Sequence, residues 1–369
     1  MSDNPRFIMI GGFLGAGKTT TIARLAHHYQ SLGKRVGIVT NDQATDLVDT
    51  NLLRSQGFDV GEVAGSCFCC NFNELTSTME RLGETQLPEI VIAEPVGSCT
   101  DLVATVIRPL QSIYSQPFDI APYGVILKPS HGLKILKGSS KGGFSPQAEY
   151  IFRKQIEEAD FVLINRIDEL SQAAVDELAS LLELHFPGTP CLRISASSGE
   201  GFEAFCEHLN LTGAFGGKVM DVDYDVYAEG EAELGWLNAQ ADLKSPTPIA
   251  LDDFIMTLLD RINLCLNEHA AEVAHLKVIG MADGQYAVAN LVSSSSAPKL
   301  SIGSGLKTSS ANLVINARVA CAPDSLTKTI EDTLHAVCLE FGVTEKMNTL
   351  QSFRPGRPVP THRMSGTES

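Results

Sequence analysis

The sequence predicts an α/β domain with a mainly parallel sheet, followed by a small α+β domain. Strand-like and helix-like segments alternate from the N-terminus to about residue 210, as in a parallel sheet covered by helices. A glycine-rich segment follows the first strand. Beyond residue 222 the alternation gives way to strands that pair as hairpins and to long helices. The length of 369 residues also favours two domains.

Composition narrows the classes of function. The formal net charge of −16 argues against binding to nucleic acid or to an anionic membrane, since both favour a basic surface. No apolar run approaches the length of a membrane span, and the N-terminus lacks the basic segment of a secretory signal. Three of the nine cysteines are clustered, which is typical of reduced thiols used for metal or redox chemistry. We therefore expect a cytoplasmic protein.

Residues 12–19 match the phosphate-binding pattern of glycine, four residues and Gly-Lys-Thr. An apolar strand (6–10) precedes the loop, and a helix with apolar residues at helical spacing follows it, so a chance glycine-rich turn is a poor explanation. Glycines let the backbone turn its N–H groups toward phosphate oxygens. Lys18 would neutralise the β- and γ-phosphates, and the Thr19 hydroxyl would complete a Mg²⁺ shell. The expected nucleotide contacts are Gly12, Gly15, Ala16, Gly17, Lys18, Thr19 and Thr20.

Carboxylates follow two of the expected strands. Further strands are expected at 35–40, 58–63, 90–93, 123–127, 161–164 and 191–194, with helices at about 73–82, 149–159 and 172–184. Asp42 and Glu94 come just after strands, at the sheet edge where open α/β sheets bind ligands. Each could hold Mg²⁺, directly or through water, or orient the attacking water; a helix cap is the alternative for each. With Lys18, they are the candidate catalytic residues. Gly97 lies in the same loop as Glu94 and is a further expected nucleotide contact.

The segment 165–168 (Asn-Arg-Ile-Asp) predicts the base specificity. Asp168 can accept hydrogen bonds from the N1–H and the exocyclic amine of guanine, which adenine cannot offer, so Asn165 and Asp168 favour GTP. The same segment argues against an ATP-using small-molecule kinase. Ser195 and Ala196 follow the last strand of the domain and are expected at the same ligand-binding edge.

Cys67, Cys69 and Cys70 form the third candidate site. On an extended segment, alternation would put Cys67 and Cys69 on one side, with Cys70 at a turn. Three thiolates suit Zn²⁺ or another thiophilic ion such as Co²⁺ or Ni²⁺ and leave a fourth position open. A buried apolar cluster and a redox pair are the alternatives. Cys99, two residues after Gly97, is either a fourth ligand or a small core residue.

The second domain is expected at 231–345, after a P-loop domain at 1–211 and a linker at 212–230. It has strand-like segments and helices in the approximate order β-α-β-β-β-α, including a hairpin across Asp283-Gly284. Residues 346–369 form a basic, proline-rich tail. Such a tail either docks on the acidic body or on a partner, or frays as a terminus.

Taken together, these motifs resemble the CobW/HypB/UreG family of P-loop GTPases, and specifically its CobW branch. The resemblance covers residues 1–210 and rests on these segments: 12–20, 65–70, 94–97, 155–160 and 165–168. The second domain is similar to the CobW C-terminal domain in its element order and in Gly235-Trp236-Leu237-Asn238.

The resemblance implies a P-loop NTPase fold and a GTPase, slow without a partner, that acts as a metallochaperone or metal-cofactor insertion factor. Cys67, Cys69 and Cys70 would hold the ion, and the GTP state would control its capture or release. Mg²⁺ would bind at Thr19, with Asp42 and Glu94 in the switch regions. The implied partner is a client metalloenzyme or a cobalamin-related protein. The resemblance also implies a homodimer. The alternative is a GTP-dependent activator that remodels a corrinoid- or metal-dependent enzyme, with structural or sensory cysteines.

The sequence departs from the family pattern at several positions. Arg166 replaces the usual lysine of the guanine-binding segment, and its planar guanidinium could still stack over a base. Lys128-Pro129 stands where CobW relatives usually have an aspartate. The segment 40–42 (Thr-Asn-Asp) is closer to the UreG branch, and a histidine-rich linker for bulk metal storage is missing.

Overall fold

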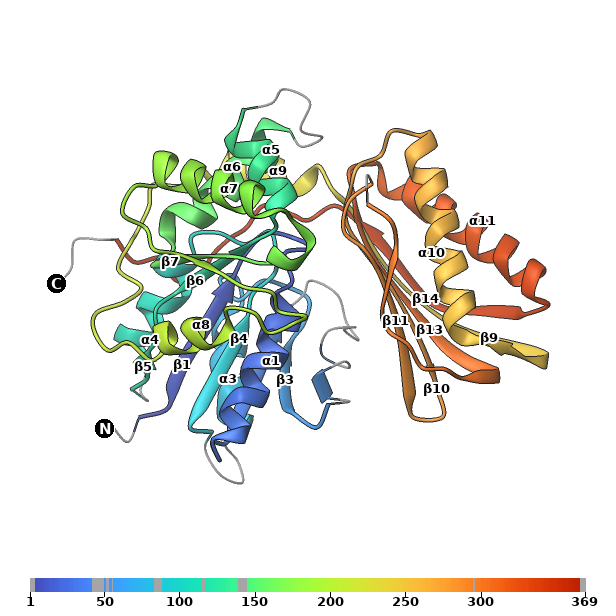
Figure 1. Cartoon of the computed structure of the whole chain (residues 1–369), viewed down its shortest axis with the longest axis horizontal. Helices are drawn as coiled ribbons and strands as arrows, with labels where there is room; N and C mark the ends of the chain where they lie inside the picture. The colour runs from blue at the N-terminus through green and yellow to red at the C-terminus, as the bar shows by residue number, and fades with distance from the viewer. Residues whose placement is uncertain are drawn as a thin grey trace. The chain divides into compact units, whose positions relative to one another are not determined.

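The chain folds into two compact units (Figure 1). The computed structural model describes residues 4–41, 50, 53–54, 56–82, 88–114, 117–138, 145–294 and 296–365. The first unit comprises Met1–Tyr227 together with Arg357–Ser369, and the second comprises Ala228–Gly356. The C-terminal residues therefore belong to the same unit as the N-terminal ones.

The first unit is built on a parallel sheet, as the sequence predicts. Its strand order is β3-β2-β4-β1-β6-β7-β8, and the short β5 also pairs with β1. All of these pairings are parallel. The strands are β1 (Arg6–Gly11), β2 (Val36–Asn41), β3 (Asp59–Val63), β4 (Ile90–Glu94), β5 (Asp119–Ile120), β6 (Gly124–Leu127), β7 (Phe161–Ile164) and β8 (Cys191–Arg193).

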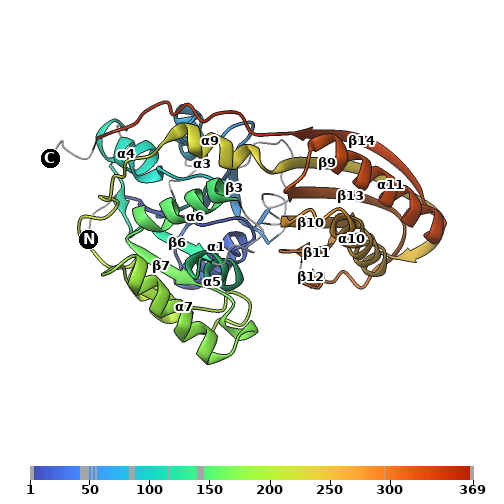
Figure 2. The same cartoon turned by 90° about the horizontal axis from the view of Figure 1, so that it is seen from above.

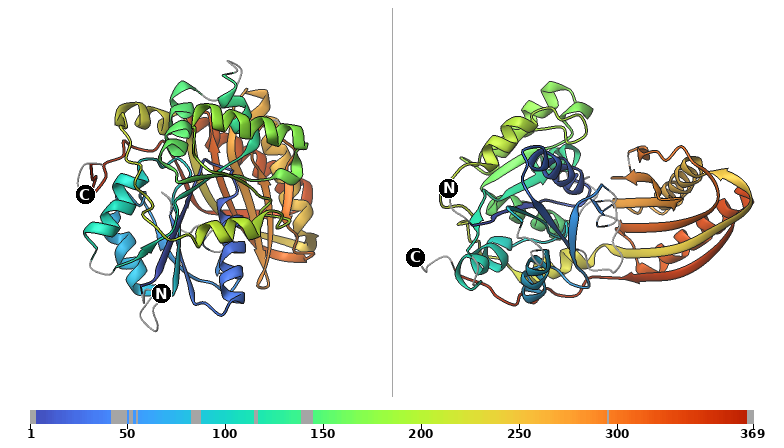
Figure 3. Two further views of the ribbon diagram at one scale, coloured as in Figure 1. Left: turned by 60° about the vertical axis from the view of Figure 1, so that its left-hand side comes forward. Right: turned by 90° about the horizontal axis from the view of Figure 1, so that it is seen from below.

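Helices cover both faces of this sheet (Figure 3). They are α1 (Lys18–Ser31), α3 (Phe72–Leu82), α4 (Arg108–Ser112), α5 (Pro129–Leu136), α6 (Pro146–Glu158), α7 (Gln172–His185) and α8 (Phe202–Leu209), with a π-helical turn at Val103–Ile107 and a 3₁₀ turn at Ile167–Glu169. A further helix, α9 (Tyr224–Ala232), begins in the first unit and ends in the second. Apolar residues of α1 and α8 share one core with alternate residues of β1, such as Ile8 and Ile10. Alternation along β1 thus assigns every second side chain to this face. None of the helices in the described part of the chain combines the length and apolar character needed to cross a membrane.

The second unit has a six-stranded antiparallel sheet in the order β12-β11-β10-β13-β9-β14. Its strands are β9 (Gly235–Ala250), β10 (Val273–Ala282), β11 (Gln285–Leu291), β12 (Lys299–Ile302), β13 (Lys307–Val319) and β14 (Thr344–Phe353). The predicted hairpin is confirmed, because β10 and β11 pair from Ala282↔Gln285 to Leu276↔Leu291. Asp283 and Gly284 have φ angles of 52° and 73°, as a two-residue hairpin turn requires.

Two edge strands of the second unit differ from the sequence expectation. The observed order is β-α-β-β-β-β-α-β, because β12 and β14 were not expected. Residues 346–353, expected in the tail, instead pair with β9 as part of β14. β12 has only four residues, all of them exposed, and β14 is mostly polar and largely exposed. Edge strands are often short or rich in polar residues, so their sequences give a weak strand signal.

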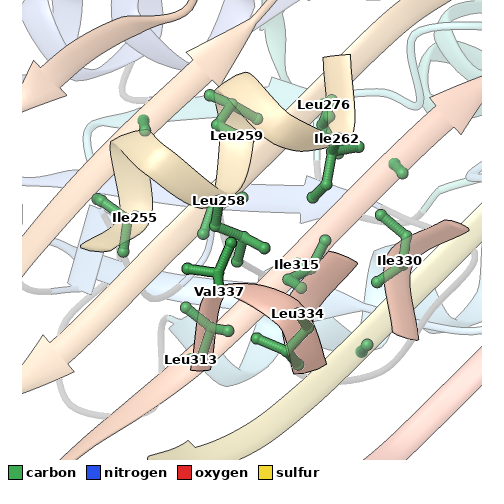
Figure 4. Packing of buried hydrophobic residues seen from close by; sticks show 14 of the residues in the cluster. Ile255, Leu258, Leu259, Ile262, Leu276, Leu313, Ile315, Ile330, Leu334 and Val337 are labelled. Atoms are coloured by element: carbon green, nitrogen blue, oxygen red, sulfur yellow. The ribbon is translucent and has the colours of Figure 1, made fainter. Parts of the chain in front are cut away.

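Two helices cover one face of the second sheet, α10 (Leu251–Glu268) and α11 (Pro323–Phe341) (Figure 2). Figure 4 shows their shared core, in which Leu258 of α10 and Val337 of α11 point toward each other beside Ile315 of β13. Leu258 is fully buried, whereas Leu264 of the same helix is 60% exposed. The helix therefore packs its apolar face on the sheet and exposes its opposite face to solvent.

We predict that Leu258→Ala destabilises the second unit by about 2–5 kcal/mol, because it removes buried methyl groups and leaves a cavity. Leu264→Ala, on the exposed face of the same helix, is the matched control and should have little effect. Trp236, the single tryptophan, is buried in this unit, so its fluorescence during urea unfolding reports the change. Equal unfolding midpoints for the two variants would contradict this description of the core.

Candidate functional site

The phosphate loop lies between β1 and α1. Gly12, Gly15 and Gly17 have positive φ angles of 134°, 71° and 96°, a conformation that favours glycine. A Cβ atom on Gly12 would lie 2.1 Å from the backbone oxygen of Ile126 in β6, so only glycine fits there. The ammonium of Lys18, the first residue of α1, donates to the Gly12 carbonyl at 2.9 Å. The loop thus presents backbone N–H groups at a helix N-terminus, an arrangement that binds phosphate.

A hydroxyl and a carboxylate meet beside this loop. The Thr19 hydroxyl donates to Oε1 of Glu94, the last residue of β4, at 2.9 Å. Oxygen ligands of this kind suit Mg²⁺. Asp42, the other expected carboxylate, lies outside the described residues, and the side chain of Thr20 is exposed.

Gly97 follows Glu94 and contacts the phosphate-binding lysine. A Cβ atom on Gly97 would lie 2.9 Å from the Lys18 ammonium and 2.8 Å from a methyl group of Leu14. Glycine at this position therefore lets the loop after β4 approach the phosphate loop closely.

Asn165 joins three loops at the other end of the site. Its amide nitrogen donates to the Ala16 carbonyl at 2.8 Å, and its oxygen accepts from the Ala196 N–H at 3.0 Å. Asp168 is exposed, with its Oδ2 accepting from the Ser197 hydroxyl at 3.3 Å. The structure therefore leaves the Asp168 carboxylate accessible to a base, beside the phosphate loop that Asn165 supports.

Ser195 and Arg24 support the loop after β8. Ser195 is fully buried, and its hydroxyl accepts from the Ser198 N–H at 3.0 Å. Its side chain therefore stabilises the conformation of the loop. The guanidinium of Arg24 in α1 donates to the Ala196 and Ser197 carbonyls at 2.7 Å each. The sequence does not indicate this role of Arg24, because an arginine on a helix surface gives no local sign of its partners.

The three clustered cysteines lie in a turn that leads into α3. The Cys70 and Asn71 N–H groups both donate to the Cys67 carbonyl at 3.0 Å. The expectation of an extended segment is therefore wrong: the turn, rather than strand alternation, gathers the sulfurs. The Cys67 sulfur lies 3.1 Å from those of Cys69 and Cys70, which are 3.7 Å apart.

The sulfur spacing suits a thiophilic ion. A tetrahedral ion with Zn–S bonds of about 2.3 Å separates its sulfurs by about 3.8 Å, so small side-chain rotations would accommodate it. Cys67 and Cys69 are buried, and Cys70 is partly exposed, which leaves a route for an ion. The buried Cys99 also hydrogen-bonds to the Cys67 and Cys69 sulfurs, so the structure brings this fourth cysteine to the cluster.

The pKa values of the clustered thiols are shifted in opposite directions. Hydrogen bonds from Cys69, Cys70 and Cys99 hold the pKa of Cys67 well below its usual value, because they favour its thiolate. The same hydrogen bonding to Cys67, together with burial, raises the pKa of Cys69 well above its usual value. It also raises the pKa of Cys70 to about 11. The cluster thus favours one thiolate supported by neighbouring thiols.

Asn41 connects the cysteine turn to the end of β2. Its side-chain nitrogen donates to the carbonyls of Val63 (2.9 Å) and Ser66 (2.7 Å). Its side-chain oxygen accepts from the Phe68 N–H at 2.8 Å. Asn41 immediately precedes Asp42, the expected Mg²⁺ ligand. The residue next to Asp42 in sequence is therefore hydrogen-bonded to the cysteine segment.

Gln155 of α6 supports a second connection. Its buried side-chain nitrogen donates to the Gly97 carbonyl at 3.0 Å and to the Cys99 carbonyl at 2.8 Å. The same amide therefore supports the glycine that contacts Lys18 and the cysteine that contacts the cluster. Neither Asn41 nor Gln155 was identified as a site residue from sequence, because these contacts join distant segments.

Arg166 and Lys128, two of the positions that depart from the family pattern, have defined contacts. Arg166 adopts a left-handed conformation (φ 63°) and forms an ion pair with Glu169 at 3.2 Å. Lys128 is buried, and its ammonium lies 3.4 Å from Nε2 of the buried His131. The ring of His131 in turn contacts that of Phe13 in the phosphate loop.

Comparison with known proteins supports this description. The model of the CobW/HypB/UreG nucleotide-binding domain matches residues 6–191. A zinc chaperone CobW from Sinorhizobium sp. is 35% identical over 97 residues, 24% of this chain and 27% of that protein. The zinc chaperone YeiR from Escherichia coli K12 is 26% identical over 166 residues, 43% of this chain and 46% of that protein. The chain thus aligns with less than half of the length of each of these relatives.

Two solved structures are similar over different shares of the chain. HypB from Helicobacter pylori in complex with nickel has a TM-score of 0.40 at 19% identity, over 57% of this chain and 92% of that one. Zn(II)-bound YjiA GTPase from E. coli has a TM-score of 0.37 at 12% identity, over 92% of this chain and 99% of that one.

The family match covers about half of the chain, from the first strand of the parallel sheet to the start of β8. It includes the phosphate loop, the cysteine turn and the Asn165–Asp168 segment, whose geometry is described above. The chain belongs to the CobW/HypB/UreG family, with a P-loop nucleotide-binding domain and a separate antiparallel α+β domain.

Proposed function

We propose that the protein is a GTP-binding and GTP-hydrolysing metallochaperone or metal-cofactor insertion factor that binds a transition metal, its cargo, under nucleotide control. The observation that carries this proposal is the group of three sulfurs within 3.7 Å of one another, on a turn hydrogen-bonded to the end of β2. Zn²⁺ is the favoured ion because two aligned relatives are zinc chaperones; thiolates also accept Co²⁺ and Ni²⁺. We further propose delivery to a client metalloenzyme.

The nucleotide site supports GTP as the bound nucleotide. Asp168 would accept from the guanine edge, and the phosphate loop with Lys18 would hold the phosphates. Thr19 and Glu94, with Asp42, would hold Mg²⁺, which neutralises phosphate charge when bound. Asp42 or Glu94 would orient the attacking water. We propose that turnover is slow until a partner supplies further charge stabilisation.

We predict that Gly97→Ala weakens nucleotide binding by about tenfold or more, since the added methyl would meet the Lys18 ammonium at 2.9 Å and displace it from the phosphates. Gly217→Ala is the matched control, because a Cβ atom there meets nothing within 4 Å. Titration with a fluorescent GTP analogue measures both affinities. Equal affinities would show that the loop after β4 does not act on Lys18.

We predict that Cys67→Ser lowers Zn²⁺ affinity at least about a hundredfold, because it removes the sulfur that contacts both neighbours. Cys265→Ser, in the second unit, is the control and should bind as the wild type does. Competition with a chromophoric chelator under reducing conditions gives the affinities. If Cys67→Ser binds normally, the cysteines are structural or sensory groups, and the partner-remodelling alternative is favoured.

We predict that Zn²⁺ binding strengthens as pH rises from 6.5 to 8.5. The raised pKa values keep Cys69 and Cys70 protonated in the metal-free cluster, whereas the ion binds thiolates. Release of two protons would strengthen the apparent affinity up to about a hundredfold per pH unit. The same chelator competition, corrected for chelator protonation, measures the slope. A pH-independent affinity would show that thiol protons are not displaced.

A further inference from the structure

The C-terminal segment, residues 357–365, lies directly against the cysteine turn; we name it the C-terminal strap. The Val359 N–H donates to the Cys70 sulfur at 3.3 Å. The Thr361 N–H donates to the Cys69 carbonyl at 2.8 Å, and its hydroxyl donates to the Cys70 carbonyl at 3.0 Å. The strap therefore contacts two of the three clustered cysteines and one of their sulfurs.

An ion pair fastens the strap to the loop that carries Cys99. Nε of Arg363 lies 2.7 Å from Oδ2 of Asp101, whose side chain is 1% exposed. Arg363 also donates to the Met220 carbonyl at 2.8 Å, and Asp101 accepts from the Tyr224 hydroxyl at 2.7 Å. A buried carboxylate requires a charged or hydrogen-bonding partner, so loss of Arg363 would be costly to this arrangement.

Contacts on either side of this ion pair extend the docking of the strap. Arg357 pairs with Asp225 at 2.9 Å, and the Met364 N–H donates to the Ala104 carbonyl at 2.9 Å. The His362 ring contacts the edge of Phe72 at the start of α3. Figure 2 shows the segment passing α9 and approaching α4. The prolines 358 and 360 favour an extended backbone, which lowers the entropy lost on docking.

We propose that the C-terminal strap is a working part of the cysteine site: its Val359 N–H orients the Cys70 sulfur, and its docking closes one side of the cluster. This proposal rests on the proposed function, in which the cysteines hold an ion. Hydrogen bonds to a ligand atom fix its orientation and tune its affinity for metal. A docked strap would hold the ion more tightly and slow its release, so a receiving protein would have to displace the strap.

The test compares two substitutions at one position in the full-length protein. Val359→Pro removes the N–H that donates to Cys70, whereas Val359→Ala keeps it. The Val359 side chain is 69% exposed, so neither change empties a core, and its place between two prolines favours the extended backbone that proline adopts. We expect Val359→Pro to weaken Zn²⁺ binding about tenfold and Val359→Ala to bind like the wild type. Equal affinities for the two variants would overturn the proposal.

A second measurement needs no metal. In reduced, metal-free protein, alkylation of Cys70 by iodoacetamide should be severalfold faster in Arg363→Met than in Val359→Ala, because loss of the Arg363–Asp101 ion pair frees the strap from the cysteine turn. Mass spectrometry of the Cys70 peptide gives the rates, and unchanged nucleotide binding and Trp236 fluorescence show that the variants are folded. Equal alkylation rates would overturn docking of the strap. If Cys67→Ser leaves Zn²⁺ affinity unchanged while these rates differ, the metal function fails and the docked strap remains.

Discussion

The parallel pairing of β1, β2 and β4 places three functional segments at one edge of the sheet. Strands that run in the same direction end on the same side, so the phosphate loop, Asn41 and Glu94 become neighbours although they are far apart in sequence. The hydrogen bond from Thr19 to Glu94 depends on this register. So does the contact of Gly97 with Lys18. The relative positions of these segments are therefore set by the strand pairing, and their side-chain contacts follow from it.

Two connections run from this edge to the sulfur cluster. One passes through the Asn41 amide to the Ser66–Phe68 backbone, and the other follows the loop from Glu94 to Cys99, which Gln155 supports. A change at the nucleotide could therefore move the cysteines without a large rearrangement, provided that the ion binds the two states with different affinity. Only thiolates bind the ion, so the ionisation of these cysteines matters as well as their position.

Features that depend on local chemistry could be predicted from the sequence, and features that depend on distant contacts could not. The phosphate loop, its flanking strand and helix, and the Asp283-Gly284 hairpin have backbone requirements that glycine positions and apolar spacing reveal. The turn at Cys67 was missed because it forms through hydrogen bonds to one carbonyl rather than through a periodic pattern. The edge strand β14, which pairs with β9, was missed because its residues are mostly polar.

The roles of Asn41, Arg24 and the C-terminal strap illustrate the same limit. Each acts through side-chain or backbone hydrogen bonds to segments that lie far away in sequence, and nothing in its own neighbourhood indicates the partner. The expected placement of Lys18, Thr19, Glu94, Asn165 and Asp168 at one edge came from the alternation of strands and helices and from motif spacing. The expected roles of these residues toward a nucleotide, and that of Asp42, remain proposals that binding experiments decide.

The most direct test of the central claim is the Zn²⁺ affinity of the reduced protein with and without Mg²⁺ and a non-hydrolysable GTP analogue, in the wild type and in Asn41→Ala. If the nucleotide and metal sites are coupled through Asn41, the nucleotide should change the affinity of the wild type severalfold and that of Asn41→Ala much less. Equal Zn²⁺ affinity in the two nucleotide states of the wild type, with nucleotide binding verified, would contradict the coupling and leave two independent sites.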